Sequence, residues 1–486
     1  MGRVPLLLLS DLLEYLSYLQ DNKTQIIIRD YDIPYFPDIS RFTNLVSLTI
    51  NDNNLTYLPP LNNSLEILFC ERNKLTSLPK LNENLKKIIC YCNQLTSLPE
   101  LNKKLEILYC DDNQISCLPE LNENLQVLNC HSNKLTSLPK LNKNLKDLNC
   151  SDNPLISLPK LNDNLEKLRC VSNNLTYLPS LNKNLKELCC ASNLLTSLPE
   201  LNEKLIKLTC SFNKLTYLPN LNESLITLIC NGNELISLPN LNNNLKAIDC
   251  SDNNLTSLPE NCKNLVILDC GYNNLVTLPN LNIDSLEELY CHNNQLKYLP
   301  ELNKNLLTLG CHNNQLICLP KLPTNLRHLF CQNNQLLYLP RLNNNIKQIQ
   351  CFNNKLTYLP EIPESIQIIC IEDYQNPSII IYAKDRNNSY YPTDYSSDKY
   401  NRYLNYSHWF DISSYTRINM FNFKKKVKVY NCFIFMFYVI KFKKQFNKWL
   451  WKSREKKIKA QFSPEKLHEL LEQNKGDDLE NILEKW

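Results

Sequence analysis

Hydrophobic and polar positions recur along this chain with a period of twenty residues. The stretch from residue 81 to residue 100 reads LNENLKKIICYCNQLTSLPE, and its near copies share the unit LxxLxCxxNxLxxLPxLNxN. Ile88 and Cys90 follow the two-residue alternation of a short strand, which places both side chains on one face. Pro99 then fixes an extended return segment that leaves no room for a helix. We therefore expect each unit to form one coil with a single short strand.

One column of the repeat, which we call the ladder position, holds cysteine in most copies. Ile50 takes this place in the first good copy, Ile371 in a degraded last copy and Ile28 in a half-formed copy before the first. One residue is inserted once, around residues 283–285. The ladder cysteines are Cys70, Cys90, Cys110, Cys130, Cys150, Cys170, Cys190, Cys210, Cys230, Cys250, Cys270, Cys291, Cys311, Cys331 and Cys351.

Two further columns do not vary in the sixteen well-formed copies. The column of Asn93 is always asparagine and the column of Pro99 is always proline. Asn93 lies where the chain bends off the strand, so its amide can donate to and accept from backbone groups of neighbouring coils. One coil cannot bury its apolar side alone, and about eighteen of them stacked at ~4.8 Å give a curved solenoid roughly 80–90 Å long.

The repeat resembles the leucine-rich repeat, and LPELNENLQVLNCHSNKLTSLP resembles the short 20-residue class found in bacterial effectors. The resemblance covers residues 25–375 and implies about 17–18 repeats in a mostly β, α/β-type right-handed solenoid. It implies a parallel sheet on the concave face, an extended or polyproline-II-like convex side and short helical caps at both ends. Such proteins usually recognise partner proteins through the concave face. Abundant Asn, Lys, Ile and Tyr resemble leucine-rich repeat proteins of giant DNA viruses of the mimivirus type.

The ladder cysteines have three readings: metal ligands, disulfides, or small hydrophobic residues in the core. A metal site needs two to four converging ligands, and the chain has no CxxC pair. Adjacent coils lie within the Cα range of a disulfide, but stacked parallel strands send neighbouring side chains off in parallel. Ile50 and Ile371 occupy the same column, so we favour cysteine as a small core hydrophobe.

Partner-binding residues are expected in the columns one and three residues away from the ladder position, which point outward on the concave face. Exposed aromatic residues there have the chemistry of interface anchors. The middle of the face is polar and mixed, and we expect His292 and His312 to be two solvated histidines in adjacent coils. The candidate partner-binding residues are Ile67, Phe69, Ile89, Tyr91, Ile107, Tyr109, Tyr290, His292, His312, His328, Phe330 and Phe352.

The two ends of the chain have their own character. Residues 1–24 predict an amphipathic helical cap that weakly resembles the first helix of an F-box. Residues 376–422 form a Tyr- and Asn-rich linker, and residues 423–486 a helical tail that is first basic and then acidic. The basic part, residues 424–460, contains a helix pattern that could lie on a membrane surface, contact nucleic acid or pack on its neighbour. Of these readings we favour packing on its neighbour.

Composition removes several function classes. The formal net charge of +4 says little about partners, and five glycines are too few for a phosphate-binding loop, a dinucleotide fingerprint or a nucleophile elbow. The N-terminus lacks a cleavage site and the longest apolar run is too short for a membrane span. We expect an intracellular location, in the host cytoplasm if the protein is viral, where the 22 cysteines are thiols.

These observations predict a non-catalytic monomeric scaffold that binds a partner protein, a host protein if the chain is viral, without metal or cofactor. One alternative is a ubiquitin-ligase adaptor that uses the F-box-like N-terminus. Another is a ligase-type effector, but Cys432 is the one cysteine after the repeats and lies in an apolar run without the expected CxD context. A third is a membrane-surface scaffold that uses the basic segment.

Overall fold

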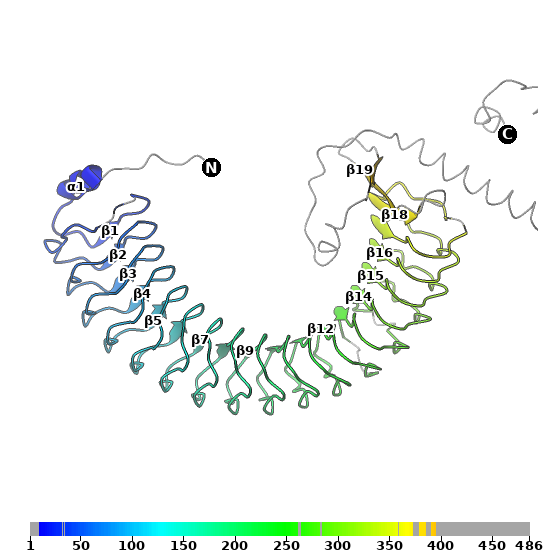
Figure 1. Ribbon diagram of the computed structural model, residues 1–486, viewed down its shortest axis with the longest axis horizontal. Helices are drawn as coiled ribbons and strands as arrows, with labels where there is room; N and C mark the ends of the chain where they lie inside the picture. The colour runs from blue at the N-terminus through cyan, green and yellow to red at the C-terminus, as the bar shows by residue number, and fades with distance from the viewer. Residues whose placement is uncertain are drawn as a thin grey trace, which may run out of the picture.

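Short parallel strands stack along one curved solenoid in the computed structural model (Figure 1). The structure describes residues 9–31, 33, 35–260, 264–281, 284–357, 359–372, 379–384 and 390–394. The strands line the inner side of the arc, and the turns that join them form its outer side (Figure 1). This is the predicted leucine-rich-repeat type of solenoid, mostly β and with its sheet on the concave face.

One helix and twenty strands are described. The helix α1 spans Leu9–Tyr18. The strands are β1 (Gln25–Ile27), β2 (Ser47–Thr49), β3 (Ile67–Phe69), β4 (Lys87–Ile89), β5 (Ile107–Tyr109), β6 (Val127–Asn129), β7 (Asp147–Asn149), β8 (Lys167–Arg169), β9 (Glu187–Cys189), β10 (Lys207–Thr209), β11 (Thr227–Ile229), β12 (Ala247–Asp249), β13 (Ile267–Asp269), β14 (Glu288–Tyr290), β15 (Thr308–Gly310), β16 (His328–Phe330), β17 (Gln348–Gln350), β18 (Ile368–Glu372), β19 (Ile379–Lys384) and β20 (Tyr390–Asp394).

The strand register reproduces the sequence period. From β2 to β13 each strand pairs in parallel with the next at an offset of twenty residues, as in Ile67 opposite Lys87. The offset rises to twenty-one between β13 and β14, where Ile267 lies opposite Glu288, which places the single inserted residue between these coils. After β18 the pairing changes, because β18, β19 and β20 pair in antiparallel fashion.

The core is a set of columns that run the length of the arc. Leu85, Ile88, Cys90 and Leu95 have 0% exposure, and all fifteen ladder cysteines are 0–1% exposed. The Sγ of Cys90 donates to the carbonyl of Tyr109 in the next coil at 3.3 Å, and other ladder thiols repeat this contact. The ladder position is therefore narrow core filling with a weak hydrogen bond.

The invariant asparagine ties each coil to its predecessor, as its column predicts. Asn93 Nδ2 donates to the carbonyl of Cys70 in the preceding coil at 3.0 Å and to those of Cys90 and Tyr91 in its own coil. Its Oδ1 accepts from the backbone N–H of Leu75 at 3.0 Å. One amide thus makes hydrogen bonds to four backbone groups in two successive coils.

A left-handed backbone residue precedes this asparagine in every well-formed coil. The residue two positions after the ladder has a φ between 49° and 57° from Asp52 to Asn353, with Gly232 at 65°. Asp, Asn and Ser fill most of this column, but Phe212 and Tyr272 also adopt it. A left-handed conformation costs about 1–2 kcal/mol for such residues, so the asparagine hydrogen bonds offset a recurring backbone strain.

A second asparagine column, from the LNxN part of the unit, stabilises the outer side of the coil. Asn82 Nδ2 donates to the carbonyls of Asn62 at 2.7 Å and Leu65 at 3.0 Å in the preceding coil. Its Oδ1 accepts from the backbone N–H groups of Asn84 and Leu85. The sequence pattern contains this column, but its role as a second tie between coils emerges from the structure.

Helix α1 covers the first coil. Leu12 is 0% and Leu16 is 6% exposed, and both belong to the continuous hydrophobic core. Arg41 donates to the carbonyls of Leu16 and Leu19 near the end of the helix. These contacts attach the helix to the start of the solenoid. No helix in the part of the chain that the structure describes is long and apolar enough to cross a bilayer.

Several expectations lie outside the described residues. These are the C-terminal helical cap, the basic segment 424–460 and the surroundings of Cys432.

Replacement of an invariant asparagine, three residues after the ladder position, should destabilise the solenoid far more than replacement of its neighbour. Asn173 is 7% exposed and makes four hydrogen bonds, whereas Asn174 beside it is exposed. We expect Asn173→Ala to lower the free energy of unfolding by about 2–4 kcal/mol, because several buried groups lose their partner. Asn174→Ala should change it by less than about 0.5 kcal/mol. Urea denaturation of both variants measures the difference, and equal effects would contradict the role of the asparagine.

Ladder thiols should resist alkylation in the folded protein. Burial raises the pKa of Cys150 to about 12, so the reactive thiolate is scarce near neutral pH. Cys117 lies exposed outside the ladder and is the internal control. We expect iodoacetamide at about pH 8 to label Cys117 in the folded chain and Cys150 after denaturation. Peptide mass spectrometry reads both sites, and equal labelling in the folded chain would refute the burial argument.

Candidate functional site: the concave face

Each coil contributes the outward side chains of one short strand to the concave face. In a typical three-residue strand the middle residue is buried, and the first and third are partly exposed. The residue after the ladder position is buried in most coils but half-buried in others, among them those of Tyr91, His292 and Phe352. The predicted columns therefore lie on the concave face, and adjacent coils place equivalent side chains about 4.8 Å apart.

The N-terminal candidates form a continuous apolar stripe across three strands. Phe69, Ile89 and Tyr109 occupy the third position of β3, β4 and β5 and lie side by side in register. Ile89 is 7% exposed, while the two rings are half-buried. Lys87 Nζ lies 5.2 Å from the centre of the Phe69 ring, a cation–π contact. Ile67, Ile107 and Tyr91 border this stripe as half-buried residues.

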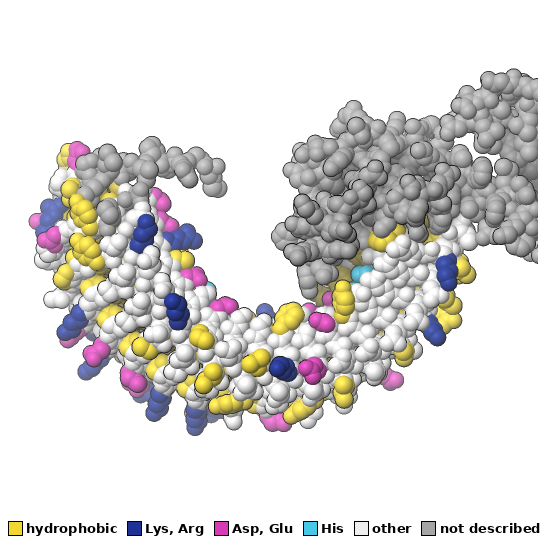
Figure 2. Space-filling model, viewed as in Figure 1, with side chains coloured by type: hydrophobic (Ala, Val, Ile, Leu, Met, Phe, Trp, Pro, Cys, Tyr) yellow, Lys and Arg dark blue, Asp and Glu magenta, His cyan; other side chains and the backbone are white. Residues whose placement is uncertain are grey.

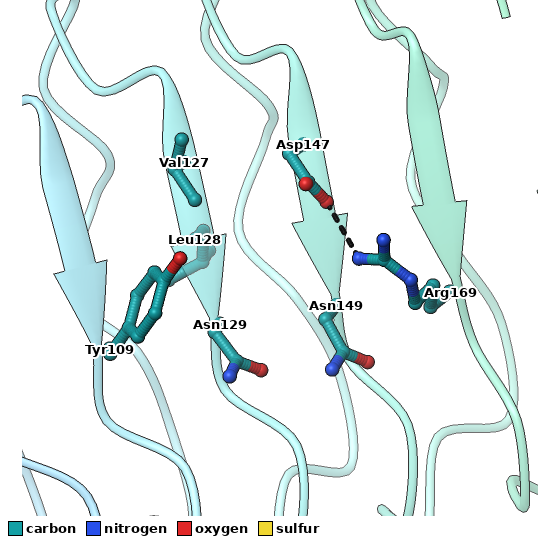
Figure 3. Close-up of a pocket in the computed structure, with 7 residues that line it drawn as sticks. All are labelled: Tyr109, Val127, Leu128, Asn129, Asp147, Asn149 and Arg169. Atoms are coloured by element: carbon teal, nitrogen blue, oxygen red, sulfur yellow. Dashed lines mark hydrogen bonds and ion pairs between the residues drawn. The ribbon is translucent and has the colours of Figure 1, made fainter. Parts of the chain in front are cut away.

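A small hollow follows the apolar stripe on its C-terminal side (Figure 3). Figure 3 shows the Tyr109 ring leaning towards β6, with Asn129 and Asn149 side by side on the next two strands. Asp147 and Arg169 close the hollow, joined by an ion pair of 3.1 Å between Oδ1 and Nη1. The hollow thus has a tyrosine ring at one end, two amides in the middle and a guanidinium at the other end.

Charges continue across the strands beyond the hollow. Arg169 Nη2 lies 3.9 Å from Glu187 Oε2, and Lys167 Nζ lies 2.9 Å from Glu187 Oε1. These side chains are 38–40% exposed, so the pairs contribute little to stability and mainly fix where charge stands on the face. Figure 2 shows Lys and Arg side chains gathered on the outer rim of the N-terminal half, interspersed with acidic ones.

The C-terminal candidates form a second cluster that depends on two glycines. A Cβ at Gly271 would lie 2.4 Å from Cε1 of His292, and a Cβ at Gly310 would lie 2.8 Å from Cδ1 of Tyr290. Each glycine therefore leaves room for a ring from a neighbouring coil. The remaining candidates of this cluster, all half-buried, are His312, His328, Phe330 and Phe352.

His292 and His312 are not the solvated pair that the sequence predicts. Their rings stack with centroids 4.6 Å apart and an interplanar angle of 14°, and Tyr272 meets His292 edge-on at 5.2 Å. Burial lowers the pKa of His292 to about 4, and burial together with His292 lowers the pKa of His312 to about 3. Both are neutral at physiological pH, because the aromatic stack displaces the water that would solvate a charge.

Two aspartates face each other in the polar middle of the face. Asp249 and Asp269 are register partners on β12 and β13. Burial, with a smaller effect of the Asp249 charge, raises the pKa of Asp269 to about 7, although the backbone N–H of Gly271 donates to its carboxylate at 3.0 Å. This region is therefore acidic but only partly ionised near neutral pH.

A group of four titratable residues escaped the sequence reasoning. Asp111, Asp112 and His131 bring one ligand-type atom each within 4.8 Å of the other two. Cys92 adds a thiol 3.6 Å from Asp112. A usable signal was present, since three consecutive ladder cysteines are followed by the pairs YC, DD and HS. This pattern extends over two neighbouring columns, so the residues of one column alone do not show it.

Solved structures of similar architecture identify the family. YopM from Yersinia enterocolitica WA-314 is 31% identical over 74% of this chain and 88% of its own, with a TM-score of 0.66. A leucine-rich effector protein from Yersinia pestis, also YopM, is 33% identical over 67% of this chain and 88% of its own, with a TM-score of 0.57. This chain belongs to the leucine-rich repeat family. No family model and no curated protein matches the sequence.

A third relative, also a solved structure, contains a cysteine ladder as well. The functional domain of InlJ from Listeria monocytogenes includes a cysteine ladder and is 25% identical over 76% of this chain and 88% of its own, with a TM-score of 0.53. Family membership gives the chain the general character of a protein-interaction scaffold.

The histidine stack should make the folded protein sensitive to acid. Both pKa values lie below the unfolded value of about 6.5, so the unfolded chain binds more protons as the pH falls below that value. Stability is therefore fully present above about pH 6.5 and declines towards pH 4. Between about pH 7 and pH 5 we expect a loss of about 2 kcal/mol per histidine that is absent in the His292→Phe/His312→Phe variant.

Urea denaturation of both proteins at the two pH values measures this loss. The comparison cancels the opposite contribution of Asp269, whose raised pKa favours the folded state in acid. An identical pH dependence in the two proteins would show that burial in the stack does not lower the pKa values of the two histidines.

Proposed function

We propose that this leucine-rich repeat protein is a scaffold that holds a partner protein against the N-terminal half of its concave face. The supporting observation is the continuity between the apolar stripe of Phe69, Ile89 and Tyr109 and the polar hollow closed by Arg169. Aromatic and arginine side chains supply most of the binding energy in protein interfaces. Here the aromatic residues lie on β3 and β5, and Arg169 lies on β8 at the far end of the same hollow.

The rigid framework beneath these residues favours this role. Leu68, Ile88 and Leu108, the middle residues of the same strands, are 0–1% exposed and lock the strands to the core. A partner therefore meets side chains whose backbone is already ordered, which lowers the entropic cost of association. The Asp147–Arg169 pair places one negative and one positive group at fixed positions beside the apolar stripe, which favours one orientation of the partner.

The adaptor alternative receives less support. A recruiting helix must present its apolar face to another protein, but Leu12 and Leu16 of α1 are buried in the solenoid core. Leu13 and Tyr18 are exposed on the same helix, at 49% and 77%. The helix contacts agree better with a cap than with a docking element.

Matched triple variants test the proposed face. The variant Phe69→Ser/Tyr91→Ser/Tyr109→Ser removes three candidate anchors, and we expect it to weaken partner binding by at least about 30-fold, since one interface anchor contributes about 2 kcal/mol or more. The control set of exposed tyrosines outside the strand face comprises Tyr57→Ser, Tyr177→Ser and Tyr217→Ser.

The measurement is quantitative affinity capture of the full-length chain from cells in which it naturally occurs, with unfolding midpoints recorded for every variant. Loss of the same captured proteins with the concave set, and their retention with the control set, supports the proposal. Retention with both sets, or equal loss with both at unchanged stability, would refute the choice of face.

A further inference from the structure

Three consecutive coils bring three metal-ligating side chains together beside the concave face, with a thiol next to one of them. The ladder residues Cys90, Cys110 and Cys130 are each followed by two residues that form a grid of two columns and three rows. One column holds Tyr91, Asp111 and His131, and the other holds Cys92, Asp112 and Ser132. Ligand-type atoms of Asp111, Asp112 and His131 all lie within 4.8 Å of one another, so three donors face one small volume.

Two contacts in this grid have the lengths of the edges of a metal tetrahedron. Asp111 Oδ2 lies 3.3 Å from His131 Nε2, and Cys92 Sγ lies 3.6 Å from Asp112 Oδ2. Tetrahedral zinc with bonds of about 2.0 Å to oxygen and nitrogen has ligands about 3.3 Å apart, and a thiolate bond of about 2.3 Å lengthens that edge to about 3.5 Å. The two pairs come from different columns and match separately.

The groups around the donors hold them in ligand-like orientations. His131 Nδ1 lies 2.9 Å from Ser132 Oγ, which leaves Nε2 on the side of the carboxylate. Asn129 Nδ2 donates to Asp111 Oδ1 at 2.9 Å and leaves Oδ2 towards the histidine. Hydrogen bonds of this kind to the far atom of a ligand commonly orient histidines and carboxylates in metal sites.

The charge distribution also favours a cation. Asp111 is 7% exposed, and Asp112 follows it directly in the chain. The facing groups are the imidazole of His131 and the thiol of Cys92, while Arg72 of the neighbouring coil pairs with Asp52 at 3.5 Å. A divalent ion stabilises the negative charges of two adjacent carboxylates, one of them buried, more than a single imidazole does.

We propose that Asp111, Asp112 and His131, with Cys92 as the fourth ligand, bind a divalent first-row metal ion of the zinc type. A set of two oxygens, one nitrogen and one sulfur fits such an ion, whereas magnesium and calcium take oxygen ligands. The ion would join three coils next to Tyr91 and Tyr109, at the edge of the proposed partner-binding face. Metal binding at this site does not depend on the identity of the partner protein.

Cobalt(II) is the probe, because its spectrum reports both coordination geometry and a sulfur ligand. The full-length chain is treated with a chelator, kept reduced and titrated with Co²⁺. We expect tetrahedral d–d bands and a thiolate-to-cobalt charge-transfer band, displaced by one equivalent of Zn²⁺ and not by excess Mg²⁺. Zn²⁺ should also raise the unfolding midpoint, because it binds the folded chain.

Variants assign each ligand. His131→Ala and Asp112→Asn should weaken Co²⁺ binding by at least about 100-fold, and Asn129→Ala by about 10-fold through lost orientation. Cys92→Ser should abolish the charge-transfer band, whereas Cys117→Ser, an exposed thiol in the next coil, should leave it intact. Circular dichroism of each variant controls for folding.

The outcomes separate the proposal from its rivals. If Co²⁺ binding is unchanged in His131→Ala, the site is refuted and the Asp111–His131 contact is an ion pair only. If the charge-transfer band survives in Cys92→Ser, other thiols bind the metal and the proposal is wrong. If binding persists without that band in the unaltered chain, the assignment of Cys92 is overturned.

Discussion

The hydrogen bonds of one invariant asparagine per coil hold this structure together. The chain leaves each strand through a left-handed residue, a conformation that most side chains avoid. Asn173 and its equivalents satisfy the backbone groups that this turn buries, in their own coil and in the coil before. Because the amide reaches across the stack, no coil is complete without its neighbour, and the solenoid behaves as one body.

That constraint explains which positions vary. The core columns of leucine and cysteine must fill a fixed width, and the asparagine must reach fixed carbonyls. Neither requirement applies to the outward residues of the strands. Adjacent coils can therefore carry Tyr109, Asn129 and Asn149 in one column without changing the fold. The side chains that differ between coils therefore lie on the concave face, while the core residues beneath them repeat from coil to coil.

Much of this architecture could be predicted from the sequence because contacts recur at a fixed spacing. The twenty-residue period gives the strand register, and the inserted residue appears as the offset between Ile267 and Glu288. The concave columns follow from the two-residue alternation. Other features depend on side chains from different columns and coils, such as the room at Gly271 for His292, and repeat position alone could not predict them.

The sequence by itself determined the coil, its ladder and the orientation of the strand residues within the repeat, because these follow from periodicity and from the geometry of Asn and Pro. The tertiary structure decided which variable side chains meet. Stacking shields His292 and His312 from water, closes the hollow between Tyr109 and Arg169, and brings Cys92 and Asp112 within 3.6 Å of each other. The physical reason is that these partners lie about one repeat or more apart, and only the stacked register sets their distances.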